Sequence, residues 1–300
     1  MIRYDKDFLK TNSYLLFFRS FGWVILGLIL CFLVNNVLVV GFDYPTFYNI
    51  FIDFDKMSFV VLSLYITGFF VPIAFVFSSS SSSLRIDAKI LHQFNIYLIR
   101  AFFWTIIFTG LVDFIIAFMR VEKILPFIFD DYLTRALGRS IFVGLYIHIP
   151  LIILGFVVAL FTRTLGFTWL ALLIVAGELL IVISRFIFSY EQSFMGDLVR
   201  YWYAALFLYA SAYTLYEEGH VRVDVFYASM NRKTKSFINA FGSIFLGAST
   251  CIAIILFGLD GKRSIINSPI LNFEVTQTGT VGMFIKYQMA GFLAIFAITM

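Results

Sequence analysis

Charged residues are scarce in this 300-residue sequence. Aspartate, glutamate, lysine and arginine together make up 13% of it, whereas they make up about a quarter of an average soluble domain. Hydrophobic residues make up 61%, which is more apolar surface than a globular core needs. The composition therefore excludes an ordinary soluble protein and predicts an integral membrane protein.

Cysteine, histidine and catalytic motifs are also scarce. Cys31 and Cys251 both fall in apolar runs and are expected to be small buried hydrophobic residues, so they imply no disulfide and no metal site. A buried haem would need a pair of histidines on facing spans, but His92 and His220 lie in loops, which leaves His148 without a partner. No phosphate-binding loop, dinucleotide fingerprint, nucleophile motif or zinc-protease motif occurs. We therefore expect neither an enzyme nor a cofactor.

Long apolar runs, by contrast, are plentiful. About eight of them have the roughly 17 to 22 residues that a helix needs to cross the hydrocarbon core of a bilayer, which predicts an all-α helical bundle of about eight spans. The first is too long for a signal-peptide core and no small-residue cleavage site follows it, so we expect it to be uncleaved. The eight runs are Trp23–Val40, Ser58–Phe77, Ala101–Phe118, Ile141–Phe161, Phe167–Phe188, Leu198–Leu215, Phe237–Leu259 and Gly282–Met300.

Two segments next to these runs carry their own expectations. Leu84–Asn95 follows a serine run and is expected to form a short surface or interfacial helix, separate from the third span. The last run stops at Met300 without a polar flank, which suggests that the natural chain continues.

Basic residues indicate the orientation. The net charge is +4, and the basic residues lie in loops rather than on one clustered face, which argues against nucleic-acid binding. With the N-terminus inside, most of them lie on the inner side, including Arg222 and the run from Arg232 to Lys235. The loop from Arg120 to Ser140 is the exception because it places four basic residues outside. The positive-inside rule favours a cytoplasmic N-terminus.

Three polar residues inside the predicted spans, Asp113, His148 and Glu178, are candidates for a functional role. Asp113 and Glu178 would each cost about 2.5–3.5 kcal/mol to insert into the membrane without a partner. Glu178 and Arg185 are seven residues apart and so share a helix face without touching. The carboxylates could bind neighbouring helices or could relay protons or ions. His148 lies two residues before Pro150 and is expected to form a hydrogen bond between helices near the proline kink.

The most specific stretch runs from Arg200 to Lys235. An aromatic span ends in Glu217-Glu218-Gly219 and is followed by His220-Val-Arg-Val-Asp224 and the basic run Asn231–Lys235. Arg222 and the basic run could anchor the loop at anionic lipid headgroups or could pair with acidic residues of a partner protein. A plain positive-inside anchor is the alternative for this loop.

The second half of the chain resembles a known family in four ordered motifs. The motifs that carry the resemblance are Arg185-Phe-Ile-Phe188, Glu191 to Arg200 with Tyr201, His220 to Asp224 with Phe226-Tyr227, and Ile270-Leu-Asn-Phe-Glu274. In these motifs the chain is similar to the small membrane subunit, of DctQ type, of tripartite ATP-independent periplasmic (TRAP) transporters. Where the family has adjacent acids before its second span, this chain has Met195-Gly-Asp197, so that only Asp197 carries the charge.

The resemblance implies a transport role in the bacterial inner membrane. A periplasmic solute-binding protein would capture an organic acid, and a large permease subunit would move it inward with the sodium gradient. The small subunit would act as a scaffold beside that permease. The resemblance also implies a division into an N-terminal extension of about four spans (residues 1–165) and a DctQ-like domain of about four spans (166–300). Its motif residues would contact partner subunits or support the fold: Arg185, Asp197, Arg200, His220, Arg222, Asp224 and Glu274.

A self-sufficient transporter or channel is the alternative function. Such a protein would use Asp113, Glu178 and the loop from Arg120 to Ser140 as its pathway and would move a solute without a partner. The resemblance does not name the transported solute, because in the resembled systems the binding protein selects it.

Overall fold

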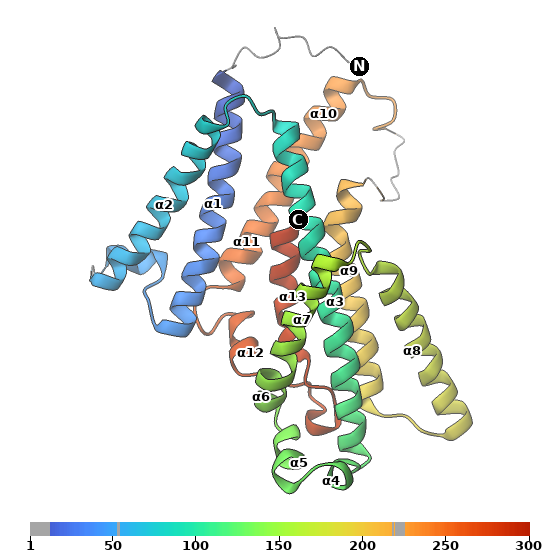
Figure 1. Ribbon diagram of the computed structural model, residues 1–300. Helices are drawn as coiled ribbons and strands as arrows, with labels where there is room; N and C mark the ends of the chain where they lie inside the picture. Colours follow the sequence, from blue (N-terminus) through green and yellow to red (C-terminus); the bar gives the residue numbers. More distant parts are fainter. Residues whose placement is uncertain (1–12, 53–54, 218, 220–225) are drawn as a thin grey trace. The chain divides into compact units, whose positions relative to one another are not determined.

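The computed structural model describes residues 13–52, 55–217, 219 and 226–300, and all regular structure in these residues is helical. Figure 1 shows the helices along the chain. The longer ones are α1 (Ser13–Phe42), α2 (Lys56–Ser78), α3 (Leu84–Val121), α7 (Ile149–Phe161), α8 (Phe167–Phe188), α9 (Ser193–Tyr216), α10 (Arg232–Phe241), α11 (Ser249–Gly258) and α13 (Lys286–Thr299). The shorter ones are η2 (Phe47–Phe51), α4 (Leu125–Ile128), α5 (Asp131–Leu137), α6 (Ser140–Val143), α12 (Asn267–Leu271) and η5 (Gly279–Val281).

Two π-helical turns join helices into longer rods. The turn η3 (Gly144–His148) connects α6 to α7, and η4 (Gly242–Ala248) connects α10 to α11. Six helical rods in the described part of the chain are long and apolar enough to cross a membrane: Tyr14–Phe42, Lys56–Ser78, Leu84–Val121, Ser140–Phe161, Phe167–Phe188 and Arg232–Gly258. The prediction of an all-α, multi-pass membrane protein is therefore confirmed.

The predicted number of eight spans is not confirmed. The run Leu198–Leu215 lies in α9, whose tyrosines together with Arg200 lower its hydropathy. The run Gly282–Met300 gives only α13, whose 14 residues extend about 21 Å at 1.5 Å per residue, short of the hydrocarbon thickness of about 30 Å.

The expectation of a separate surface helix at Leu84–Asn95 is wrong. That segment and the predicted span Ala101–Phe118 form one continuous helix, α3, of 38 residues. The residues between them are Ile96-Tyr-Leu-Ile-Arg100, which include no glycine or proline that could end a helix.

The helices form two compact units, Met1–Phe94 and Asn95–Met300. In the first unit, the backbones of α1 and α2 are in direct contact at Gly27 and Gly68. A methyl group at Gly27 would overlap the carbonyl oxygen of Gly68. Small residues allow this close approach, and helix pairs in membranes depend on it for their van der Waals packing. The same unit contains a buried ion pair, in which Nε of Arg19 lies 2.7 Å from Oδ2 of Asp87.

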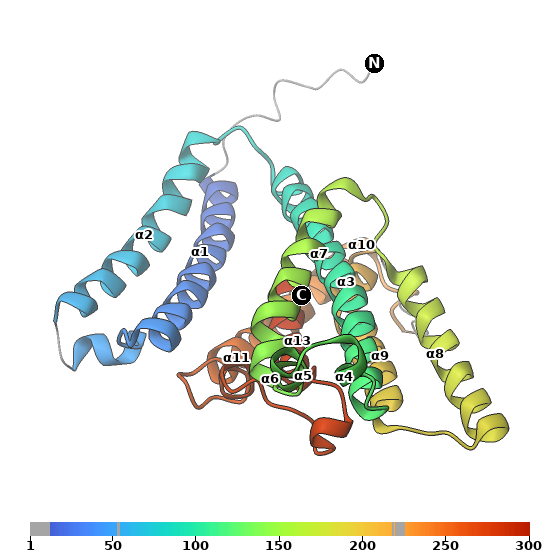
Figure 2. The ribbon, with the colours of Figure 1, turned by 60° about the horizontal axis from the view of Figure 1, so that its bottom comes forward.

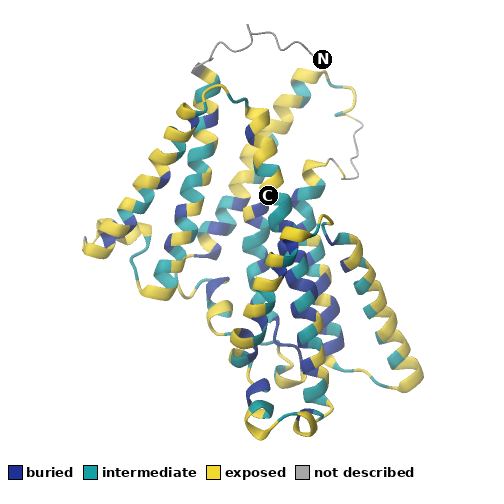
Figure 3. Cartoon of the chain, viewed as in Figure 1, coloured by how far each residue is buried: buried dark blue, intermediate teal, exposed yellow. Residues whose placement is uncertain are grey.

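The second unit has an aromatic core between α3, α8, α9 and α13 (Figures 1 and 2). Tyr209 on α9 lies at its centre, with its ring 5.7 Å from that of Phe103 on α3 and 5.1 Å from that of Phe292 on α13. The indole of Trp202 donates to the carbonyl of Ile106 on α3 at 3.3 Å. Burial is concentrated along α9 and the second half of α3, whereas the outer face of α8 is exposed (Figure 3).

Candidate functional site

A non-helical segment with buried side chains precedes α13. In this segment, Gly282–Ile285, the residues Met283, Phe284 and Ile285 are at most 2% exposed. We refer to it as the buried segment. Buried backbone N–H and C=O groups need partners, and irregular backbone is tolerated within a membrane only where the protein supplies them.

Two carboxylates accept the amide protons of the buried segment. Oδ2 of Asp197 on α9 accepts from the amide of Met283 at 3.1 Å, and Oδ2 of Asp113 on α3 accepts from the amide of Phe284 at 2.7 Å. Gly282 allows the close approach, because a Cβ atom there would lie 2.6 Å from Oδ2 of Asp197. The two carboxylates thus hold consecutive amides of one segment from two different helices.

Arg120 of α3 binds the carbonyl oxygens of the same region. Its guanidinium donates to the carbonyls of Thr280 at 2.7 Å and Gly282 at 2.6 Å, and it donates more weakly to that of Leu137 at 3.4 Å. Its Cζ lies 4.0 Å from the centroid of the Phe284 ring, a cation–π distance. The guanidinium therefore balances the negative charge brought by the carboxylates and fixes the start of the segment.

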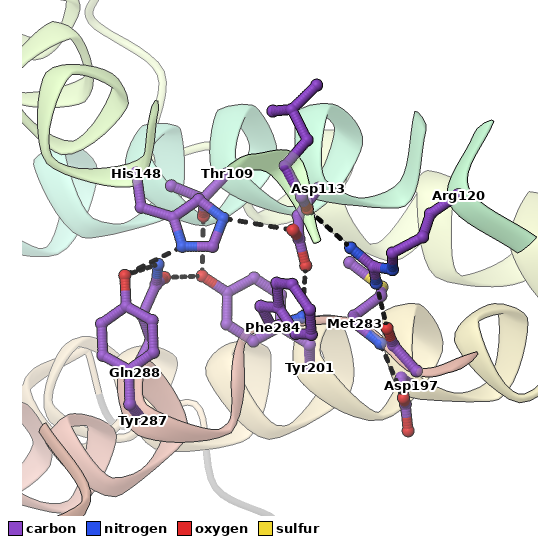
Figure 4. A network of polar contacts seen from close by, with 12 residues as sticks. Thr109, Asp113, Arg120, His148, Asp197, Tyr201, Met283, Phe284, Tyr287 and Gln288 are labelled. Carbon is purple, nitrogen blue, oxygen red and sulfur yellow. Dashed lines mark hydrogen bonds and ion pairs between the residues drawn. The ribbon is translucent and has the colours of Figure 1, made fainter. Parts of the chain in front are cut away.

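A chain of polar side chains leads away from Asp113 (Figure 4). Asp113 and His148 are both completely buried, and Oδ1 of Asp113 lies 3.4 Å from Nε2 of His148. This separation exceeds a normal hydrogen bond, and neither atom has another hydrogen-bond partner in the described structure. On its other side, Nδ1 of His148 shares a hydrogen bond of 2.8 Å with the hydroxyl of Tyr287, which also accepts from Nε2 of Gln288 at 3.1 Å.

The chain continues from Gln288 to α9 and back to α3. The hydroxyl of Tyr201 donates to Oε1 of Gln288 and lies 2.7 Å from Oγ1 of Thr109. The donors can then point one way from Tyr201 through Gln288, Tyr287 and His148 to Asp113, while the single hydroxyl proton of Thr109 goes either to Tyr201 or to the carbonyl of Thr105, which lies 2.8 Å away. In this arrangement the ring proton of His148 is on Nε2 and faces the carboxylate.

The amide of Gln288 decides what such a chain can do. Its oxygen accepts from Tyr201 and its nitrogen donates to Tyr287, and an amide keeps these roles on different atoms. A proton arriving at the oxygen is therefore not passed on from the nitrogen. The contacts favour a network that positions α3, α9 and α13 over a relay that conducts protons.

The positions of these groups follow from local structure. Thr109, Asp113 and Arg120 are four and seven residues apart, which places them on one face of α3. His148 ends the π-helical turn η3, and Pro150, which has no N–H to donate, stands in the first turn of α7. Sequence reasoning singled out Asp113, His148 and Asp197 but missed the roles of Thr109, Arg120, Tyr201, Tyr287 and Gln288. The polar spacing along α3 was the one available signal.

The other predicted site residues lie apart from this network. Arg185 at the end of α8 is 3.3 Å from Glu191, and both are exposed. Glu274 forms a half-exposed ion pair with Lys286. Arg200 and Glu178 are exposed, and Glu178 does not join Arg185 in a polar contact.

The motif from His220 to Asp224 lies outside the described residues. His220, Arg222 and Asp224 were predicted to contact a partner or support the fold, and that remains a prediction. The described residues contain no group of three or more His, Cys, Asp or Glu side chains able to hold a metal ion.

Comparison with known proteins finds a family match in the second half of the chain. Residues 174–300 match the family model for tripartite ATP-independent periplasmic transporters, DctQ component. This segment is a DctQ domain. No curated protein and no solved structure matches the chain. The match indicates the small subunit of a TRAP transporter, a transporter component rather than an enzyme.

The polar network crosses the limit of the DctQ domain. Tyr201 of α9 and Tyr287 of α13 belong to the domain, whereas Asp113, Arg120 and His148 precede residue 174. Residues outside the family match therefore supply two of the three side chains that bind the backbone of the buried segment, Asp113 and Arg120.

Proposed function

We propose that this protein is the small membrane subunit of a sodium-driven TRAP transporter for the uptake of organic acids. In this role it acts as a scaffold for the large permease subunit. The observation that carries the proposal is the DctQ match over residues 174–300. Proteins of this family work with a large permease and a periplasmic binding protein in a tripartite system, so we assign these two partners to the protein.

The arrangement of polar groups supports a scaffold rather than a substrate site. Asp113, Asp197 and Arg120 bind backbone atoms of the buried segment, and His148 is completely buried beside Asp113. Carboxylates and a guanidinium that are already bound to the protein's own backbone have little capacity to bind a translocated anion or sodium ion, and the remaining oxygen of Asp113, Oδ1, is completely buried and faces His148. The sodium and substrate sites then belong to the large subunit.

The proposal includes the bacterial inner membrane, a cytoplasmic N-terminus and contact with membrane lipids. Arg232 and Lys233 are exposed at the start of α10, where they would face anionic headgroups on the cytoplasmic side. We also propose that family-like sequence begins near residue 166, with residues 1–165 as an extension. The division between the two compact units lies elsewhere, between residues 94 and 95, because the extension from residue 95 onward packs in the same core as the matched segment.

Co-purification and uptake together test the function. An affinity-tagged chain purified from its native membrane should bring down a large multi-span permease. Deleting its gene should abolish sodium-dependent uptake of an organic acid, and restoring the gene should restore uptake. The proposal is wrong if no permease co-purifies and uptake persists in the deletion strain.

A self-sufficient transporter is the rival, and the described residues give it little support. Its pathway would have to join Asp113 and Glu178, yet Asp113 is completely buried and Glu178 is exposed on α8. Protein reconstituted alone in liposomes would move an organic acid under that hypothesis. We expect no transport without the large permease and the binding protein.

A further inference from the structure

Glu178 occupies an unusual place for a charged side chain. It is the twelfth of the 22 residues of α8, so about 15 Å of helix lies on either side of it at 1.5 Å per residue. A span of this length matches the hydrocarbon core of a bilayer. Glu178 is nevertheless exposed, so its carboxylate lies on the outside of the described protein at about the middle of the membrane.

The rest of α8 offers Glu178 no partner. The inner face of the helix packs on α9, where a Cβ atom at Gly177 would lie 3.2 Å from the side chain of Val199. The nearest cation on the helix, Arg185, is two turns away and pairs with Glu191. Among the described residues, Glu178 has no hydrogen bond or ion pair.

The exposed side chains beside Glu178 are apolar. Val175, Leu179 and Val182 are 66%, 58% and 48% exposed, and they surround the carboxylate with hydrocarbon side chains only. Lipid tails cannot donate a hydrogen bond, so an acidic group placed among them remains unfavourable until a donor reaches it. Acidic residues within spans accordingly face other protein rather than lipid.

We propose that the face of α8 bearing Val175, Glu178 and Val182 docks against a transmembrane helix of the large permease subunit. That helix brings an arginine, a lysine or another hydrogen-bond donor to the depth of Glu178. The proposal rests on the proposed function, which supplies the partner subunit. A second copy of this chain is the poorer occupant, because two copies in the same membrane orientation related by a two-fold axis would set Glu178 against Glu178.

Photo-crosslinking of the assembled complex tests the surface. A photoreactive amino acid at Val175 of the full chain should crosslink to the large permease subunit, identified by mass spectrometry, at a helix that carries a donor at mid-depth. The control position is Leu246, which is 68% exposed on η4 without a nearby intramembrane acid, and it should crosslink to that helix far less. Crosslinks from Val175 only to lipid, to a second copy or to the chain itself would overturn the proposal.

Substitution of the carboxylate tests its chemistry. Glu178→Leu should lower the yield of the complex about threefold to tenfold, the range expected for one interhelical polar contact in a membrane, and Glu178→Gln should lower it less. The isolated subunit should keep its melting temperature, because Glu178 makes no internal contact. Glu191→Gln, which removes an exposed charge at the helix end, is the matched control and should leave the yield unchanged.

The outcomes separate this proposal from the proposed function. If wild-type protein forms the complex and Glu178→Leu forms it equally well, the docking surface is refuted while the transporter role stands. If wild-type protein itself brings down no permease, the proposed function fails and the docking surface fails with it.

Discussion

Replacing Asp113 by leucine should loosen the buried segment more than any other single substitution of a carboxylate in the second unit. Leucine has the same branched arrangement of four heavy side-chain atoms, although its methyl groups are larger than the carboxylate oxygens, so Asp113→Asn, which is close to aspartate in size, is the companion variant. The substitution removes the acceptor of the Phe284 amide, which is bound at 2.7 Å, and the carboxylate that faces His148 at 3.4 Å. It also leaves the partly buried Arg120 guanidinium with less compensating charge.

The size of the effect follows from what is left unpaired. A hydrogen bond to a charged group contributes about 1.5–3 kcal/mol, and a buried donor left without an acceptor costs about 1–3 kcal/mol. Because these terms overlap at Asp113, we expect a total loss of about 3 kcal/mol for Asp113→Leu, in the range for breaking a buried pair. Asp113→Asn keeps an oxygen for the Phe284 amide and should cost about half as much.

Hydrogen exchange measures this loss at the right place. In purified protein in detergent micelles, a loss of about 3 kcal/mol should speed exchange of the Phe284 amide roughly 100-fold, since 1.4 kcal/mol corresponds to tenfold. The matched control is Glu274→Gln, which breaks a half-exposed ion pair with Lys286 close to the same segment and should cost under about 0.5 kcal/mol. Equal exchange rates in Asp113→Leu and Glu274→Gln would refute the assigned role of Asp113.

Three further predictions concern the first unit. Gly27→Ala should lower the melting temperature and cost about 1–3 kcal/mol of stability, because the added methyl group would overlap the backbone of α2. Gly22→Ala is the control: a Cβ atom there has no atom within 4 Å, so alanine should stabilise the helix slightly through its higher helix propensity. Arg19→Leu should cost about 3–5 kcal/mol in denaturant unfolding because it strands the buried Asp87, and adding Asp87→Leu should recover part of that loss. The backbone amide of Ser58 donates a hydrogen bond to the side chain of Asp55 at the start of α2, and this hydrogen bond lowers the pKa of Asp55. The charged Asp55 therefore stabilises α2 above its unfolded pKa of about 3.9, and this stabilisation is lost as the pH falls through the lower folded pKa. Hydrogen exchange of the first amides of α2 should become faster over that pH range, and Asp55→Asn should abolish this pH dependence.

The class of fold could be predicted from the sequence because scarcity of charge is a bulk property. The number of spans could not be, because hydropathy does not tell whether a side chain faces lipid or protein. The many tyrosines of α9 lower its mean hydropathy below that of the six candidate spans. Tyr201 and Tyr209 nevertheless lie in the core and are almost completely buried. Their rings pack against aromatic side chains of α3 and α13, an environment that exists only once the helices have come together.

The candidate site could be predicted only in part, and for a related reason. Asp113 and His148 are conspicuous because each interrupts an apolar run. Their partners are not, because Phe284 contributes a backbone amide 171 residues away in sequence and Tyr287 lies 139 residues from His148. Arg120 was assigned to an outer loop because it follows the apolar run, although its spacing from Asp113 places both on one face of α3.

The limit of the DctQ match is not a limit of the structure. An isolated segment 174–300 would contain the backbone of the buried segment and one of its carboxylates, Asp197, but neither Asp113 nor Arg120. The amide of Phe284 and the carbonyl of Gly282 would then be left without the partners they have here, and in a membrane no water replaces them. The helix α3 therefore completes the DctQ domain of this chain, and residues outside the family model are part of what holds its last helix in place.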